Sequence, residues 1–415
     1  MSKEEYDVVV IGGGASGLMC AVQAAKRGLK VCILDPNRDP GRKVRITGKG
    51  RCNLTNACTV NELMKNIPGD GRFLYSALNQ FGPDEVMAFF AENGLELKVE
   101  RGNRVFPVSD NANDVADTLV RLCRENGVVF KRTTAKKVNT YDHVLRYVVT
   151  PEGQIDCRAC VIATGGLSYP LTGSTGDGYR FAETAGHTVV PTRPSLIALN
   201  CREEYCRALQ GFSLKNVVLR AYEENKLIFS EMGEMLFTHF GVSGPLVLSA
   251  SAHMRNLPKK KYRLEIDLKP ALDDEKLDAR LLRDFKEYQN KQFSNVLPGL
   301  VGRSMAPVIL ELCEIGGDTP VNSVTREERQ KLRAVLKSFP LTVSGTRPVE
   351  EAIITAGGVS TKEINPRTME SKIVRGLYFA GEVLDLDAYT GGFNLQIAWS
   401  TGFVAGNSVL KGENS

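Results

Sequence analysis

Histidine and tryptophan are scarce in this chain, whose 415 residues include four histidines and one tryptophan. The histidines, His143, His187, His239 and His253, lack the spacing of a metal site or a catalytic triad. The ten cysteines are scattered through predicted strands and helices and do not form the compact framework of a disulfide-rich secreted domain. We therefore expect no metal site, and reduced thiols in a cytoplasmic protein.

Long apolar runs are missing as well. No run reaches the roughly 18 residues that a membrane span needs. The stretch from Met1 to Tyr6 leads straight into a predicted strand, with neither a signal h-region nor a transit pattern. The net charge is only +5, and no basic patch is interleaved with aromatic residues. We expect a small-molecule substrate and neither a membrane nor a nucleic-acid partner.

Glycine is plentiful, and its first cluster follows an apolar strand. Residues 7–17 read DVVVIGGGASG, and the β-branched run is typical of a strand buried on both faces of a parallel sheet. In the G-x-G-x-x-G pattern Gly12 allows a tight turn, Gly14 lets the backbone approach a pyrophosphate, and Gly17 lets the following helix pack on the strand. Free N–H groups at the start of that helix would face the phosphates.

A second apolar strand, residues 30–34, ends at Asp35, about 20 residues past the glycines. A carboxylate at this place can accept both hydroxyls of a ribose, and it repels a 2′-phosphate. Residues 7–35 thus indicate a site for FAD or NAD and disfavour NADP.

Two later segments favour FAD. Residues 160–166 read CVIATGG and residues 376–382 read GLYFAGE, each a short apolar strand that ends in small residues, and Glu382 is placed to hold a ribitol hydroxyl. The glycines of residues 390–392 then open a helix, whose N-terminus carries about half a positive charge. Beside the flavin N1/O2 edge, that charge would stabilise the anion formed when the ring accepts a hydride. Because NAD has no such ring, we expect a tightly, non-covalently held FAD.

Residues 41–56, GRKVRITGKGRCNLTN, combine cations with glycines and suit a diphosphate or another anion. Cys52 lies between Arg51 and Asn53, where positive charge is expected to lower the pKa of its thiol. Cys52 either takes part in the chemistry or is a small side chain that fills space beside the cofactor. The pair Cys157 and Cys160 leads into a strand and is interpreted as structural.

The order of elements predicts an α/β fold: a Rossmann-like FAD-binding domain of the glutathione-reductase type, interrupted by an inserted β-barrel and a helical subdomain. Short alternating runs predict an antiparallel sheet or a small barrel as the first part of this insertion. The insertion either covers the flavin and shapes the substrate pocket or is structural or oligomerising. The expected divisions are 1–192 for the first part of the FAD domain, 193–269 for the barrel, 270–338 for the helices, and 339–415 for the return to the barrel edge and the FAD domain.

Five stretches resemble the bacterial flavoprotein family that includes the aminoacetone oxidases and the BaiN-type bile-acid reductases. They are residues 41–56, 104–110, 166–170, 233–245 and 355–396, and together they span nearly the whole chain. Two departures are Ala388, where the pattern has glycine, and Phe393, in place of tyrosine. The resemblance implies the discontinuous FAD domain described above, and FAD contacts at Ala15, Asp35, Arg42, Lys43, Cys52, Asn53, Val138, Glu382, Asn394 and Ile397.

These patterns predict an FAD-dependent oxidoreductase that transfers a hydride between flavin N5 and an organic substrate. We favour a reductase or dehydrogenase of a conjugated carbon–carbon double bond, bile-acid-like or steroid-like, with NAD(P)H as a transient donor because no second G-x-G-x-x-G is evident. The alternatives are an amine or aminoketone oxidase that uses O2, and a flavin-containing nucleic-acid-associated or binding protein.

The proton-capable candidates for catalysis are Tyr169, His239 and Tyr389. The full set of expected cofactor residues is Gly12, Gly14, Ala15, Ser16, Gly17, Asp35, Arg42, Lys43, Gly50, Cys52, Asn53, Val138, Thr164, Gly165, Gly381, Glu382, Gly392, Asn394 and Ile397.

Overall fold

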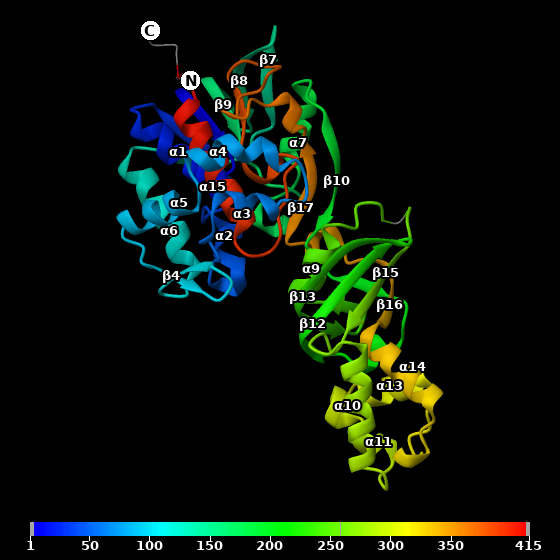
Figure 1. Ribbon diagram of the computed structural model, residues 1–415. Coiled ribbons are helices and arrows are strands. Elements are labelled where there is room, and N and C mark those ends of the chain that lie inside the picture. The colour runs from blue at the N-terminus through cyan, green and yellow to red at the C-terminus, as the bar shows by residue number, and fades with distance from the viewer. Residues whose placement is uncertain (1–3, 258, 412–415) are drawn as a thin grey trace. The chain divides into compact units, whose positions relative to one another are not determined.

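The computed structural model describes residues 4–257 and 259–411 (Figure 1). It divides into two compact units, the first formed by residues 1–195 and 349–415 and the second by residues 196–348. The chain leaves the first unit after β10 (Val189–Ser195) and returns before β17 (Ile354–Val359), which pairs antiparallel with β10. The first unit is therefore built from both ends of the chain.

A seven-stranded sheet forms the centre of the first unit. Its parallel part consists of β6 (Val129–Lys131), β2 (Val31–Leu34), β1 (Glu4–Ile11), β9 (Gly153–Ile162) and β18 (Leu377–Phe379). Strands β8 (Val144–Thr150) and β7 (Lys137–Tyr141) extend it antiparallel. The carboxyl ends of β1, β9 and β18 meet at one edge, because Ile11 pairs with Ile162 and Ile162 with Phe379.

Helices α1 (Ala15–Lys26) and α15 (Phe393–Ser408) pack closely against each other, although they come from opposite ends of the chain. A Cβ atom at Gly402 would lie 2.4 Å from the Ser16 carbonyl oxygen, and one at Gly406 would lie 2.4 Å from that of Cys20. Because Gly402 and Gly406 lack side chains, the backbones of α1 and α15 can lie this close together.

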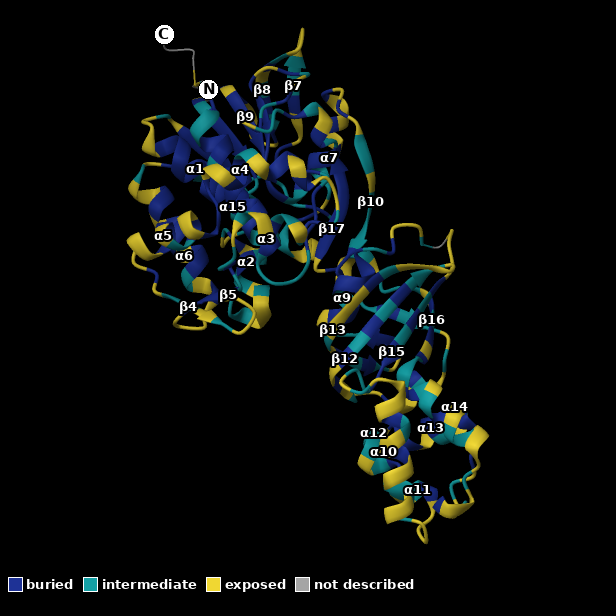
Figure 2. Cartoon of the chain, viewed as in Figure 1, coloured by how far each residue is buried: buried dark blue, intermediate teal, exposed yellow. Residues whose placement is uncertain are grey.

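The remaining elements of the first unit flank this sheet. They are α2 (Arg42–Ile46), β3 (Thr55–Asn56), α3 (Val60–Lys65), α4 (Tyr75–Gln80), α5 (Pro83–Glu92), β4 (Leu97–Glu100), β5 (Arg104–Pro107), α6 (Ala112–Glu125) and α7 (Asp177–Thr184). Buried residues concentrate along the central strands (Figure 2).

The second unit contains a closed barrel in the order β11-β14-β13-β12-β15-β16. The strands are β11 (Leu199–Cys201), β12 (Ser213–Glu223), β13 (Lys226–Thr238), β14 (Gly241–Ser243), β15 (Tyr262–Asp267) and β16 (Phe339–Thr346). The helices are α8 (Tyr205–Ala208), α9 (Pro245–Ser251), α10 (Asp274–Glu287), α11 (Phe293–Val296), α12 (Pro298–Val301), α13 (Ala306–Cys313) and α14 (Arg326–Lys337). The expected fold class, a Rossmann-like α/β fold with an inserted barrel and helices, is confirmed.

Within the described residues, no single helix is long and apolar enough to cross a membrane. The segments Phe293–Val301 and Ala306–Cys313 reach the required length and composition only as a pair, with a bend of 116° between them.

Candidate functional site

The glycine-rich turn after β1 lies at the carboxyl edge of the sheet. Gly12 has φ 102°, and a Cβ atom there would lie 2.4 Å from the Ala163 carbonyl oxygen. A Cβ atom at Gly17 would lie 1.9 Å from the Gly12 carbonyl oxygen, whereas one at Gly14 would meet no atom within 4 Å. Gly12 and Gly17 are thus required by packing, and Gly14 faces open space of the kind that a pyrophosphate needs.

Asp35, at the end of β2, holds this turn in place. Its Oδ2 accepts a hydrogen bond from the Gly13 N–H at 2.7 Å, and its Oδ1 accepts one from the Asn37 N–H at 2.8 Å. A carboxylate has about four acceptor positions. Two therefore remain for ribose hydroxyls, which is the role predicted for this residue.

Three buried polar atoms of the first unit, Asn53 Oδ1, Thr164 Oγ1 and the Tyr179 hydroxyl, have no hydrogen-bond partner among the described residues. Asn200 Oδ1 and Thr238 Oγ1 of the second unit share this property. Because buried polar groups are almost always hydrogen-bonded, each of these atoms has an unmet hydrogen-bonding requirement. Asn53 and Thr164 belong to the segments predicted to bind FAD, so the residues present fit that cofactor.

The basic segment 41–56 contains regular secondary structure. It forms the short helix α2, a 3-10 turn at Thr47–Gly50 and strand β3. Gly48, Lys49, Gly50 and Cys52 have φ between 58° and 84°. The glycines tolerate this left-handed conformation, and together these residues bend the chain sharply around Cys52.

The expected lowering of the Cys52 pKa is wrong. The thiol is buried, and this burial raises its pKa to about 12. The neighbouring guanidinium of Arg51 is engaged elsewhere, since it forms ion pairs with Glu100 and Asp110. Cys52 is therefore a small buried side chain, consistent with its alternative interpretation as a filler.

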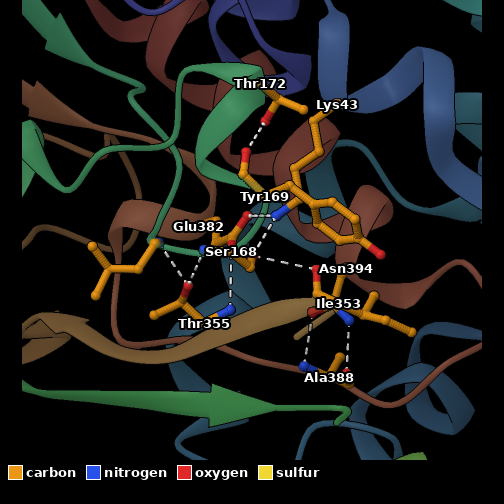
Figure 3. Close-up of polar contacts among 10 residues, drawn as sticks. Lys43, Ser168, Tyr169, Thr172, Ile353, Thr355, Glu382, Ala388 and Asn394 are labelled. Atoms are coloured by element: carbon orange, nitrogen blue, oxygen red, sulfur yellow. Dashed lines mark hydrogen bonds and ion pairs between the residues drawn. The ribbon is translucent and has the colours of Figure 1, made fainter. Parts of the chain in front are cut away.

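A network of ionic and hydroxyl groups joins three of the predicted FAD-binding segments (Figure 3). Lys43 Nζ donates hydrogen bonds to Glu382 Oε2 and to Ser168 Oγ, both at 2.7 Å. Glu382 Oε1 accepts from the Thr355 N–H at 2.9 Å and from the Ser168 hydroxyl at 3.0 Å. The carboxylate predicted to hold a ribitol hydroxyl is thus already fixed by protein donors.

The turn before α15 is locked by Asn394 and Gly392. Asn394 Oδ1 accepts from the Ala388 N–H at 2.9 Å, and its Nδ2 donates to the Ala388 carbonyl at 2.7 Å (Figure 3). Gly392 has φ 99°, and a Cβ atom there would lie 2.4 Å from the Thr55 carbonyl oxygen. No acidic side chain occupies the first turn of α15. Its N-terminal N–H groups thus remain electropositive.

The other predicted cofactor residues differ in how they lie. Ser16 Oγ donates to the Ala380 carbonyl, next to Gly381, and Gly165 has φ 72°, as a bend after β9 requires. Ile397 is buried in α15, while Arg42 donates to Asn37 on the surface. Val138 lies on β7, separated from β1 in the sheet by β9 and β8.

Tyr169 is the most unusual of the proton-capable candidates. It has φ 53°, and its carbonyl accepts hydrogen bonds from the Thr172 N–H and hydroxyl at 2.8 and 2.7 Å. Its ring is exposed, and Lys43 Nζ lies 5.8 Å from the ring centroid. The Tyr389 N–H donates to the Asn66 carbonyl, and His239 belongs to the second unit, where its ring meets Phe240 edge-on.

Sequence reasoning missed Ser168, Thr355 and Tyr179. Ser168 lies in residues 166–170, and Thr355 directly precedes Ala356 and a glycine pair. Both residues belong to stretches that resemble the family, but the sequence indicated no role for either. Their spatial partners were the missing information. Within the described residues, no group of three His, Cys, Asp or Glu side chains is arranged to hold a metal ion.

Known proteins match this chain over nearly its whole length. The family model described as HI0933-like protein Rossmann domain matches residues 6–408. The chain is 31% identical to a 3-dehydro-bile acid delta(4,6)-reductase of Clostridium scindens, over 97% of this chain and 98% of that protein. It is 30% identical to a ribosomal RNA dihydrouridine synthase of Escherichia coli, over 99% of this chain and 100% of that protein.

Solved structures share the fold. The 3-ketosteroid delta1-dehydrogenase of Sterolibacterium denitrificans matches with a TM-score of 0.52 and 12% identity, covering 98% of this chain and 99% of that chain. At that identity the likeness shows the fold alone. The family model spans nearly the whole chain and a full-length relative is 31% identical. The chain therefore belongs to the HI0933-like Rossmann family of FAD-dependent oxidoreductases.

Proposed function

We propose that this protein is a reductase or dehydrogenase that exchanges a hydride between flavin N5 and a carbon–carbon double bond conjugated to a carbonyl, with NAD(P)H as electron donor. The observation that carries the proposal is the full-length similarity to the C. scindens reductase, whose name gives a 3-dehydro-bile acid as its substrate. The unpartnered buried polar atoms in the FAD-binding segments support it.

The chain's own residues divide the work of holding the cofactor. The turn of Gly12, Gly14 and Gly17 would receive the pyrophosphate, and Asp35 the ribose. Asn53 Oδ1 would accept, and Thr164 Oγ1 would donate or accept, the hydrogen bonds that they lack within the protein. FAD, when bound, supplies the hydride chemistry, while the protein supplies orientation and electrostatics.

Tyr169 is our candidate for the proton donor to the substrate. A bulky residue at positive φ costs about 1–3 kcal/mol and persists only where the surroundings enforce it, commonly at active sites. Here the Tyr169 N–H donates to the Glu350 carbonyl at 3.2 Å, and the Tyr169 carbonyl accepts from the Thr172 N–H and hydroxyl, which together enforce this conformation. They hold a phenol at the surface beside the Lys43 network.

The test is anaerobic stopped-flow reduction of the FAD-loaded protein by NADH and by NADPH. The reduced protein is then mixed with a conjugated 3-oxosteroid or with O2, and the oxidised protein is mixed separately with an aminoketone. We expect bleaching by a nicotinamide nucleotide and rapid reoxidation by the conjugated ketone. Bleaching by an aminoketone with reoxidation by O2 would favour the oxidase instead, and inertness to both nucleotides would reject the reductase.

A second candidate is reduction of uridine in ribosomal RNA. The E. coli relative that carries this name matches over the full length of both chains. The uracil double bond is likewise conjugated to a carbonyl, so the same site chemistry would serve. Incubating the reduced protein with ribosomal RNA and measuring dihydrouridine by mass spectrometry separates this candidate from the first.

A further inference from the structure

We propose that Lys43 and Glu382 form an opposed charge pair in which each group shifts the reduction potential of the flavin and offsets the shift caused by the other, with Ser168 as the positioning residue that holds both groups. The proposal rests on the proposed binding of FAD by the first unit. It assigns a function to contacts that go beyond holding the cofactor.

The geometry of the pair is that of an ammonium and a carboxylate. Lys43 Nζ lies 2.7 Å from Glu382 Oε2 and 2.7 Å from Ser168 Oγ. Ser168 accepts from Lys43 and donates to Glu382 Oε1 at 3.0 Å, a shorter contact than its 3.4 Å to the Ile353 carbonyl. One hydroxyl thus bridges the cation and the anion and fixes both orientations (Figure 3).

Among the described residues, the pair leaves one acceptor position of Glu382 Oε2 and one N–H of Lys43 without a partner. Glu382 Oε1 accepts two hydrogen bonds, from Ser168 and from the Thr355 N–H. An ammonium has three N–H donors, and the structure uses two of those of Lys43. The third is available to an acceptor on a bound molecule.

The pair lies where three predicted FAD-binding segments converge. Lys43 is on α2, shortly after β2, Ser168 follows Gly165 and Gly166 beyond β9, and Glu382 follows Gly381 beyond β18. The side chains of Lys43 and Glu382 are 24% and 12% exposed. Water and salt screen such a partly buried pair less than a surface pair, so a change in its charge acts over a longer distance.

Electrostatics fixes the direction in which each variant shifts the reduction potential of the flavin. Reduction adds negative charge to the flavin, so a nearby cation favours the reduced form and a nearby anion disfavours it. Lys43→Met removes the cation and leaves the Glu382 carboxylate uncompensated, which lowers the potential. Glu382→Gln leaves the ammonium uncompensated, which raises it.

A purely structural role predicts something different. The pair links α2 to the turn after β18, and loss of that link lowers thermal stability in both variants. It gives no reason for shifts of potential in opposite directions. The sign of the shift therefore separates electrostatic control from structural support.

The experiment is spectroelectrochemical titration of FAD-loaded protein in the wild type, Lys43→Met, Glu382→Gln and the double variant. We expect opposite shifts in the single variants, each at least tenfold in the ratio of reduced to oxidised flavin, or about 30 mV for a two-electron couple. The double variant should return close to the wild type, and Ser168→Ala should shift less than either. Arg121→Met, which removes a surface cation of α6 that pairs with Glu125, is the control without a shift.

Each outcome of this experiment either supports the proposal or overturns it. Shifts of the same sign, or none, in yellow variants overturn the proposal and leave FAD binding intact. Loss of FAD from both single variants also overturns it, because the pair then serves to retain the cofactor. If only one variant loses FAD, the shift of the other decides. A wild type that binds no FAD rejects the proposed function itself, which distinguishes the two failures.

Discussion

At the scale of single residues, burial governs the chemistry of Cys52. With a pKa raised to about 12, roughly one thiol in ten thousand is ionised at pH 8. We expect Cys52 to resist iodoacetamide at pH 8 in the folded protein and to react after unfolding, as peptide mass spectrometry can measure. Rapid native alkylation of Cys52 would show that the thiol is accessible and that its environment differs from the one described.

Tyr169 offers a test of proton transfer. Tyr169→Phe keeps the ring and removes the hydroxyl, so we expect FAD content and bleaching by the nicotinamide nucleotide to stay unchanged. Reoxidation by the substrate should slow by about 100-fold or more, the usual contribution of a general acid. Tyr75→Phe, an exposed tyrosine on α4, is the matched control. Equal reoxidation rates in wild type and Tyr169→Phe would remove Tyr169 from the mechanism.

At the scale of elements, the crossing of α1 and α15 depends on glycine. Gly402→Ala places a Cβ atom 2.4 Å from the Ser16 carbonyl oxygen. We expect a loss of about 1–3 kcal/mol or more in the free energy of unfolding, despite the better helix propensity of alanine. Gly14→Ala, with no atom within 4 Å, should leave the melting temperature of the FAD-free protein unchanged and weaken FAD binding. The reverse pattern in thermal denaturation and FAD titration would contradict this assignment.

His187 connects the end of α7 to a later segment. Its Nδ1 lies 3.2 Å from Glu363 Oε2 and its Nε2 lies 2.8 Å from Ser371 Oγ. Burial lowers the pKa of His187, although Glu363 opposes this. The folded pKa is therefore below that of the unfolded chain, about 6.5.

The lowered pKa of His187 determines how the stability of the protein depends on pH. The stability that neutral His187 contributes is complete above about pH 6.5 and is lost as pH falls toward the folded pKa. We expect the wild type to lose more unfolding free energy between pH 7.5 and 5.5 than His187→Gln does, in urea denaturation. Parallel curves for the two proteins would show that His187 does not titrate differently on folding.

The local sequence pattern predicted the strand, turn and helix of the dinucleotide motif. The side-chain contacts of the site depend on tertiary structure, which the local pattern does not show. The β1 turn could be predicted because its strand, glycines and helix are adjacent in sequence. The contacts of Lys43 could not, because Ser168 and Glu382 are 125 and 339 residues away. The Cys52 prediction failed for a related reason: flanking charge is visible in a sequence, but burial and the partners of Arg51 are not.

At the scale of the whole molecule, the two units have separate apolar cores. A ligand held by the first unit should stabilise that unit alone, by about 2.7 kcal/mol at a concentration of 100 Kd. We expect calorimetry of the full chain to show two transitions, of which FAD raises one. Phe237→Ala, in the core of the barrel, should lower the other. A single transition that responds to both changes would show that the units unfold together.

The family assignment supports FAD as the cofactor, and we propose that the first unit holds it without a covalent bond. The most direct measurement of this claim is the visible spectrum of the purified protein, followed by denaturation and chromatography of the released flavin. We predict a yellow protein that releases one FAD per chain. A colourless protein that stays colourless after incubation with FAD would contradict the account.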